Sequence, residues 1–117
     1  MRTQPLILAL AMLGLAGCAN DPAPDEQMRI SEQALEQARA VGATEQVETL
    51  KLAEDKLDRA KANMLSGDYR DARMRAEQAE LDARLAEAKV LTQKSEEQLN
   101  VLNTRIIRLR KQLGDAQ

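Results

Sequence analysis

The sequence predicts an all-α protein, a helical hairpin with a short preceding helix and a long C-terminal helix of coiled-coil character. Three observations predict this fold. Most of the apolar residues are Ala and Leu, which favour helices. Aromatic residues make up only 1% of the 117 residues, with no Phe and no Trp, so a dense globular core of the usual kind is excluded. Apolar residues also recur at spacings of three and four over most of the chain.

Residues 1–17 are predicted to be a secretory signal peptide. Arg2 gives a positive start, and residues 6–16 are almost purely apolar. The apolar run is too short to cross a bilayer of roughly 30 Å. We therefore exclude this segment from the fold prediction.

The end of the segment, Leu15, Ala16, Gly17 and Cys18, resembles a bacterial lipobox. The resemblance implies that a peptidase cuts between Gly17 and Cys18 and that the Cys18 thiol carries a diacylglyceryl group, with fatty acyl chains such as palmitate. Two or three acyl chains make a membrane anchor that is in practice permanent. The alternative is an ordinary signal peptide with a chance Cys near its cleavage site.

Residues 18–25 are expected to form the lipidated Cys and a flexible tether, because Pro22 and Pro24 disfavour helix in the residues before them. The residue after Cys18 is Ala19. By resemblance to the lipoprotein sorting rules of Gram-negative bacteria, the absence of Asp there favours the outer membrane, with the protein facing the periplasm. Nucleic acid is not expected as a partner.

The first helix is expected over residues 26–41, ending near Gly42, with Thr44 as the N-cap of a second helix over about 45–66. Gly67 and Asp68 predict a turn and the cap of the next helix. A long helix should follow from Tyr69 to about Leu113, since this stretch contains no Gly and no Pro. The apolar pattern thins over 92–96 and leaves a break there open.

These elements divide the mature chain into an Ala-rich three-helix or hairpin region, residues 26–90, and a coiled-coil-like extension, residues 91–117. The long helix carries two lines of residues on nearly opposite faces. We call the first the alanine stripe: Ala72, Ala76, Ala79, Ala83, Ala86 and Val90. We call the second the heptad seam: Met74, Gln78, Leu81, Leu85, Ala88, Thr92, Ser95, Leu99, Leu102, Ile106, Leu109 and Leu113.

The alanine stripe is expected to pack antiparallel against the second helix, because small side chains permit a close approach. The first helix is expected to cover the first part of the heptad seam. Its last five residues, which we call the distal seam, are left uncovered: Leu99, Leu102, Ile106, Leu109 and Leu113. They predict a coiled-coil surface for a second copy or an envelope protein. The alternative is that the first helix or the tether folds back over them, or that this segment frays.

A basic cluster at the end of the long helix consists of Arg105, Arg108, Arg110 and Lys111. The helix dipole favours cations at that end. A functional alternative is contact with anionic peptidoglycan or lipopolysaccharide.

Catalysis is not expected. The chain has no His and one Cys, which excludes zinc sites of the usual kind and Ser-His-Asp or Cys-His machinery. No catalytic residue, metal site or cofactor is predicted, and the acidic residues mostly lie among Lys and Arg at helical spacing, as on a solvent-exposed face.

The stretch from Leu57 to Ala86, with its Gly67-Asp68-Tyr69 turn and alanine stripe, resembles the bacterial lipoproteins grouped as domain of unknown function 4398. The resemblance covers about residues 6–90, and its Ala-rich motifs are moderately specific. It implies a lipobox, an Ala-rich first helix that ends in Gly42-Ala43, and a Gly-Asp-Tyr turn before a second Ala-rich helix, but no assigned chemistry.

The leading hypothesis is therefore a non-enzymatic outer-membrane lipoprotein with a structural or interaction role, which presents the distal seam to a copy of itself or to an envelope protein. A noncovalent peptidoglycan binder that uses the basic cluster is the alternative. An accessory subunit of an envelope complex is a third hypothesis, which differs from the first only in the identity of the partner.

Overall fold

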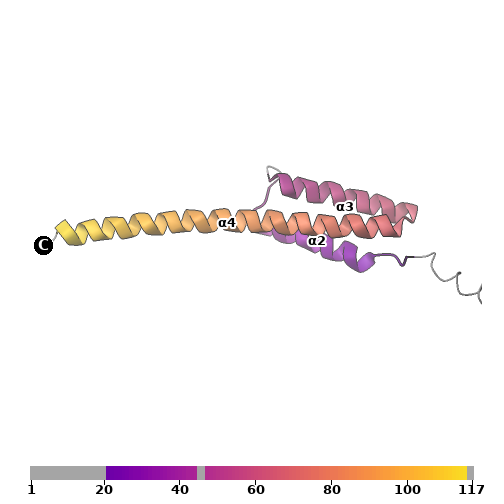
Figure 1. Cartoon of the computed structure of the whole chain (residues 1–117), viewed down its shortest axis with the longest axis horizontal. Helices are drawn as coiled ribbons and strands as arrows, with labels where there is room; N and C mark the ends of the chain where they lie inside the picture. The colour runs from indigo at the N-terminus through magenta and orange to yellow at the C-terminus, as the bar shows by residue number, and fades with distance from the viewer. Residues whose placement is uncertain (1–20, 45–46, 116–117) are drawn as a thin grey trace, which may run out of the picture.

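The computed structural model describes residues 21–44 and 47–115, and within them it contains three α-helices and no strand. They are α2 (Asp25–Ala40), α3 (Glu48–Ser66) and α4 (Tyr69–Asp115). Figure 1 shows α2 and α3 lying along the first half of α4, while the second half of α4 projects alone. The predicted fold, a helical hairpin with a short preceding helix and a long C-terminal helix, is confirmed.

Helix α2 ends where the sequence predicts. Gly42 adopts a positive φ of 101°, a conformation that side chains with a Cβ disfavour. The Gly42 N–H donates to the Arg39 carbonyl at 2.9 Å, and the Ala43 N–H donates to the Ala38 carbonyl at 2.9 Å. These bonds satisfy carbonyl groups that the helix end would otherwise leave unpaired.

The predicted N-cap of the second helix is wrong. Helix α3 begins at Glu48, and Val47 occupies the N-cap position without a side-chain capping bond. The Thr44 carbonyl instead accepts a hydrogen bond from the Val47 N–H at 2.8 Å, so Thr44 belongs to a turn that precedes the helix. Residues 45 and 46 lie outside the described part of the chain.

The turn between α3 and α4 is confirmed. Gly67 has a φ of 80°, and the Asp68 N–H donates to the Asn63 carbonyl at 2.9 Å. The Asp68 carbonyl accepts the Ala72 N–H at 2.9 Å, which places Asp68 at the start of α4 as predicted. Helix α4 then runs without a break through residues 92–96, and its 47 residues span about 70 Å.

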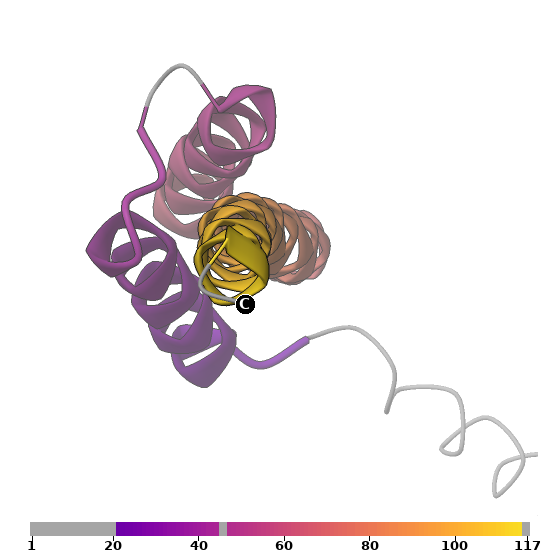
Figure 2. The same ribbon diagram turned by 90° about the vertical axis from the view of Figure 1, so that its left-hand side faces the viewer.

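The two shorter helices pack on one side of α4, as the view along the bundle shows (Figure 2). Helix α3 is antiparallel to α4 across the Gly67 turn, whereas α2 runs in the same direction as α4, since Ser31 contacts Ala76 and Val41 contacts Lys94. The five Ala residues of the alanine stripe are fully buried. Ala79, Ala83 and Ala86 form a core cluster with side chains of both shorter helices. The largest of these are Leu35, Leu50 and Leu57.

The position of α2 corrects one expectation. We expected the first helix to cover the early part of the heptad seam, yet Met74, Leu81 and Leu85 are 45%, 66% and 47% exposed. Helix α2 lies instead against the side of α4 that carries the alanine stripe. Its own buried line contains small residues, Ser31, Ala34 and Ala38, which permit a close approach to another line of small residues.

Candidate interaction surface

The heptad seam is an open surface along α4. Met74, Leu81 and Leu85 lie in the part of α4 that packs in the bundle, and their exposure shows that neither α2 nor α3 covers this face. Ala88, Thr92 and Ser95 in its middle are exposed, and Gln78 is half-buried. The surface is therefore continuous from the bundle into the projecting half of the helix.

The distal seam is the most apolar part of this surface. The exposed fractions of its side chains are 58% at Leu99, 51% at Leu102, 45% at Ile106, 57% at Leu109 and 70% at Leu113. Neither α2 nor the described part of the tether folds back over them, so that alternative is excluded for the described residues. The segment is helical to Asp115.

Lys94 marks the end of the bundle. Its Nζ donates a hydrogen bond to the Val41 carbonyl at 2.6 Å, which ties the C-terminal end of α2 to α4. Every residue from 91 to 115 is exposed. The projecting half of α4 is therefore held by its own backbone hydrogen bonds and by the bundle at its base.

The basic cluster lies on the same projecting segment, and all four of its side chains are exposed. None of them takes part in the ion pairs found within the described residues. The cluster therefore does not stabilise the bundle, and its positive charge faces solvent.

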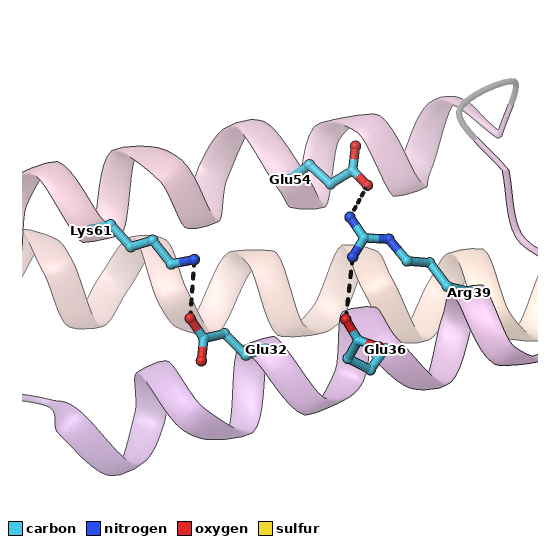
Figure 3. Close-up of polar contacts among 5 residues, drawn as sticks. All are labelled: Glu32, Glu36, Arg39, Glu54 and Lys61. Atoms are coloured by element: carbon cyan, nitrogen blue, oxygen red, sulfur yellow. Dashed lines mark hydrogen bonds and ion pairs between the residues drawn. The ribbon is translucent and has the colours of Figure 1, made fainter.

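Ion pairs connect α2 to α3 across a polar groove (Figure 3). Arg39 Nη2 lies 2.6 Å from Glu54 Oε1, and Lys61 Nζ lies 3.0 Å from Glu32 Oε1. The hydrogen bond with Glu54 raises the pKa of Arg39, which means that the contact favours the charged guanidinium. The groove floor is apolar, formed by Leu35 and Leu57. These contacts join α2 to α3, so we assign the groove to the packing of the fold and not to a binding site.

A second set of polar contacts connects the shorter helices to α4. Lys56 Nζ lies 2.5 Å from Asp82 Oδ2, and Gln27 Nε2 donates to Glu80 Oε2 at 2.8 Å. The hydrogen bond from Gln27, followed by that from Arg84, lowers the pKa of the Glu80 carboxyl. These groups stabilise the packing around the alanine stripe.

Sequence reasoning missed the apolar residues that lie off the heptad seam. Leu91, Val101 and Ile107 are 45%, 50% and 68% exposed. Val101, together with Lys94, Gln98 and Leu102, lines a shallow groove just beyond the bundle. Periodicity does not reveal such residues, because they do not recur along one face of the helix.

The predicted lipobox, Leu15, Ala16, Gly17 and Cys18, lies outside the described residues, as does the predicted cleavage point. In the described ranges, no His, Cys, Asp or Glu side chains are grouped so as to hold a metal ion. Nor is any helix there long and apolar enough to cross a membrane.

Comparison with known proteins gives one family and one solved structure. A family model described as "Domain of unknown function (DUF4398)" matches residues 26–102. A crystal structure of a DUF4398 family protein from Pseudomonas aeruginosa PAO1 is 62% identical, with a TM-score of 0.79. The match covers 82% of this chain and 100% of that one. The comparison with curated proteins found no match.

Proposed function

This chain belongs to the DUF4398 family, a domain of unknown function, and we propose that it is a non-enzymatic cell-envelope protein that binds a partner through α4. The observation that carries the proposal is the exposure of the distal seam. Five Leu and Ile side chains at heptad spacing stay exposed on a helix that projects beyond the bundle. Exposed apolar residues at this spacing are typical of a surface that another helix covers.

The length of the projecting segment favours a role in binding a partner over a role in stabilising the chain's own fold. The bundle ends near Lys94, yet α4 continues to Asp115. Short unpartnered helices are marginally stable in water, and a Leu-rich face of this kind gains stability mainly by packing. The projecting segment should therefore gain stability when a partner helix covers the distal seam, which lies at a distance from the end where α2 begins.

Anchoring to the outer membrane through Cys18 is part of the proposal and rests on the lipobox resemblance. It places the tether before α2 at the membrane and the distal seam far into the periplasm. Metabolic labelling with a palmitate analogue tests the modification, and Cys18→Ser should abolish the label. Membrane fractionation tests the address, and recovery of the labelled protein in the inner membrane would contradict it.

Photocrosslinking in living cells tests the interaction. A photoreactive residue is placed at Leu102 or at Ile106, and a matched control carries it at Thr104, which lies on the opposite side of α4. Adducts from the two seam positions and not from Thr104 support the proposal. Adducts to the same protein identify self-association, and adducts to one other protein identify an accessory role in an envelope complex. Absence of adducts from both seam positions contradicts the proposal.

A noncovalent peptidoglycan binder is the second candidate. The observation that favours it is the basic cluster, whose four cations are exposed and take no part in the ion pairs of the described residues. Co-sedimentation with purified peptidoglycan separates the two candidates. Binding that is lost when the four cations become Gln, and that is kept in Leu102→Asp, favours the wall binder.

A further inference from the structure

Charged side chains border the distal seam on both edges. In heptad notation, core position a is occupied by Leu99, Ile106 and Leu113, and core position d by Leu102 and Leu109. Arg105 then lies at flanking position g and Arg110 at flanking position e. Both are exposed. Residues at flanking positions meet those of the partner helix and decide which helices pair. The partner of the distal seam must therefore accommodate arginine on both edges.

A second copy in parallel register does not meet this requirement. In such a dimer each flanking residue faces the flanking residue five positions further along the partner helix, which pairs Arg105 with Arg110 of the other copy. The same register pairs Arg84 with Lys89. Both pairs are cation against cation and occur twice by symmetry, so the flanks oppose this dimer.

Antiparallel pairing of two copies through their projecting segments is disfavoured as well. Residues 98–114 contain the four cations of the basic cluster and no Asp or Glu. Glu96, just before this stretch, occupies the same flanking position as Arg110 and meets it when Leu99 faces Leu109 of an antiparallel copy. In that register, however, Arg105 faces Arg105 of the other copy, so a second copy meets the requirement on one edge only.

A membrane surface also fits this segment less well than a protein helix does. Helices that lie in a lipid interface have a broad apolar face and commonly insert Trp or Phe. The distal seam is a narrow line, and α4 contains no aromatic residue after Tyr69. A narrow line at heptad spacing is the geometry that a second helix covers.

We propose that the distal seam binds an amphipathic helix of a different protein, whose own apolar line is bordered by Asp or Glu. This inference rests on the proposed function and specifies the chemistry of its partner. Acidic residues beside the partner's apolar line meet Arg105 and Arg110, while Leu and Ile side chains of the two helices interdigitate. Charge complementarity of this kind sets specificity and orientation.

Two synthetic helical peptides with the same Leu and Ile line test the proposal. One carries Glu at its flanking positions and the other carries Lys, and binding of each to the full chain in detergent is followed by fluorescence anisotropy. We expect the Glu peptide to bind roughly tenfold more tightly than the Lys peptide at low salt, with the difference shrinking as salt screens the charges.

A matched pair of variants separates position from net charge. Arg105→Glu with Arg110→Glu should invert the preference for the two peptides. Arg108→Glu with Lys111→Glu makes the same change in charge away from the seam and should leave the Glu peptide preferred. Circular dichroism of both variants checks that α4 stays helical, and Leu102→Asp should weaken binding of either peptide.

Several results would overturn the inference. They are equal binding of the two peptides, an equal effect of the two double variants, a stable homodimer in sedimentation equilibrium, or tighter binding to phosphatidylglycerol vesicles than to the Glu peptide. A crosslinked partner in cells combined with no preference for the Glu peptide overturns this inference and leaves the proposed function in place. Absence of crosslinks from the seam removes both.

Discussion

Ser31 on α2 lies against Ala76 on α4, and the Ser31 Oγ is 2.7 Å from the Ala76 carbonyl oxygen. Both residues are fully buried. The hydroxyl also lies 2.8 Å from the Gln27 carbonyl of its own helix, so its single proton has two acceptors within reach. A small polar residue therefore fixes α2 on α4 at a point where a larger side chain has no room.

The first prediction concerns this contact. Ser31→Ala should cost only about 0.5–1.5 kcal/mol of unfolding free energy, because one buried hydrogen bond is lost and no cavity larger than a hydroxyl forms. Ser31→Leu should cost about 1–3 kcal/mol, since the added carbon atoms force α2 away from α4. Urea unfolding followed by circular dichroism measures both. If Ser31→Leu is as stable as the wild type, the close packing of α2 on α4 is wrong.

The alanine stripe gives a second prediction with a control of identical chemistry on the same helix. Ala83 is fully buried between the helices, whereas Ala88 lies on the exposed heptad seam. Ala83→Leu should destabilise the bundle by about 1–3 kcal/mol through overpacking. Ala88→Leu should change stability by no more than about 0.5 kcal/mol, as surface substitutions usually do. Equal effects of the two substitutions in urea unfolding would contradict the assignment of the two faces.

Much of this arrangement follows from the sequence. The turns at Gly42 and Gly67 and the burial of the alanine stripe are as predicted, because glycine at a positive φ and small residues at spacings of three and four are local signals. The face of α4 against which the first helix packs is not determined by a local signal. Periodicity shows that Ser31, Ala34 and Ala38 share one face of α2, but it does not show which face of α4 they meet.

The same limit applies to the candidate site. The exposure of the distal seam could be predicted, because nothing in the chain is long enough to cover it. The exposure of Met74 and Leu81 could not be predicted, because it depends on which of two faces of α4 packs against α2. The prediction of Thr44 as the cap was wrong for a related reason, because the Thr44 carbonyl accepts the Val47 N–H and α3 begins only at Glu48.

The third prediction concerns the turn that joins α3 to α4. Gly67 has a φ of 80°, and no atom lies within 4 Å of the position that a Cβ would occupy. Gly67→Ala should therefore cost about 1–2 kcal/mol from backbone strain alone, without a steric clash. Gly114→Ala is the control, since Gly114 is helical and its Cβ position is also open. Thermal unfolding should show a lower midpoint for Gly67→Ala only, and an unchanged midpoint would argue against the left-handed turn.

The fourth prediction is a dependence of stability on pH. The pKa of Glu80 is lowered in the folded protein, first by the hydrogen bond from Gln27, so folding favours the ionised carboxylate. Its contribution to stability is complete above the ordinary pKa of 4.5 and is lost as the pH falls through the lowered value. Glu80→Gln should therefore lose less stability than the wild type between pH 7 and acid pH.

The control for this prediction is Glu77→Gln, which removes an exposed carboxylate from the same helix. Thermal midpoints at a series of pH values measure how steeply the stability of each protein changes with pH. A slope for Glu80→Gln that equals those of the wild type and Glu77→Gln would show that the Gln27 contact does not favour the charged form.

The last prediction separates the bundle from the projection. A chain that ends at Gln98 keeps Lys94 and its hydrogen bond to the Val41 carbonyl. The described residues that it loses, 99–115, are all exposed in the full chain. Its unfolding midpoint should therefore match that of the full chain, while the helical signal in circular dichroism falls in proportion to the residues removed. Leu50→Ala serves as the contrasting variant, because it opens a cavity in the core and should cost about 2–5 kcal/mol in either chain length. A marked loss of stability on truncation would mean that the projecting segment supports the bundle, and the distal seam would then not be a surface held free for a partner.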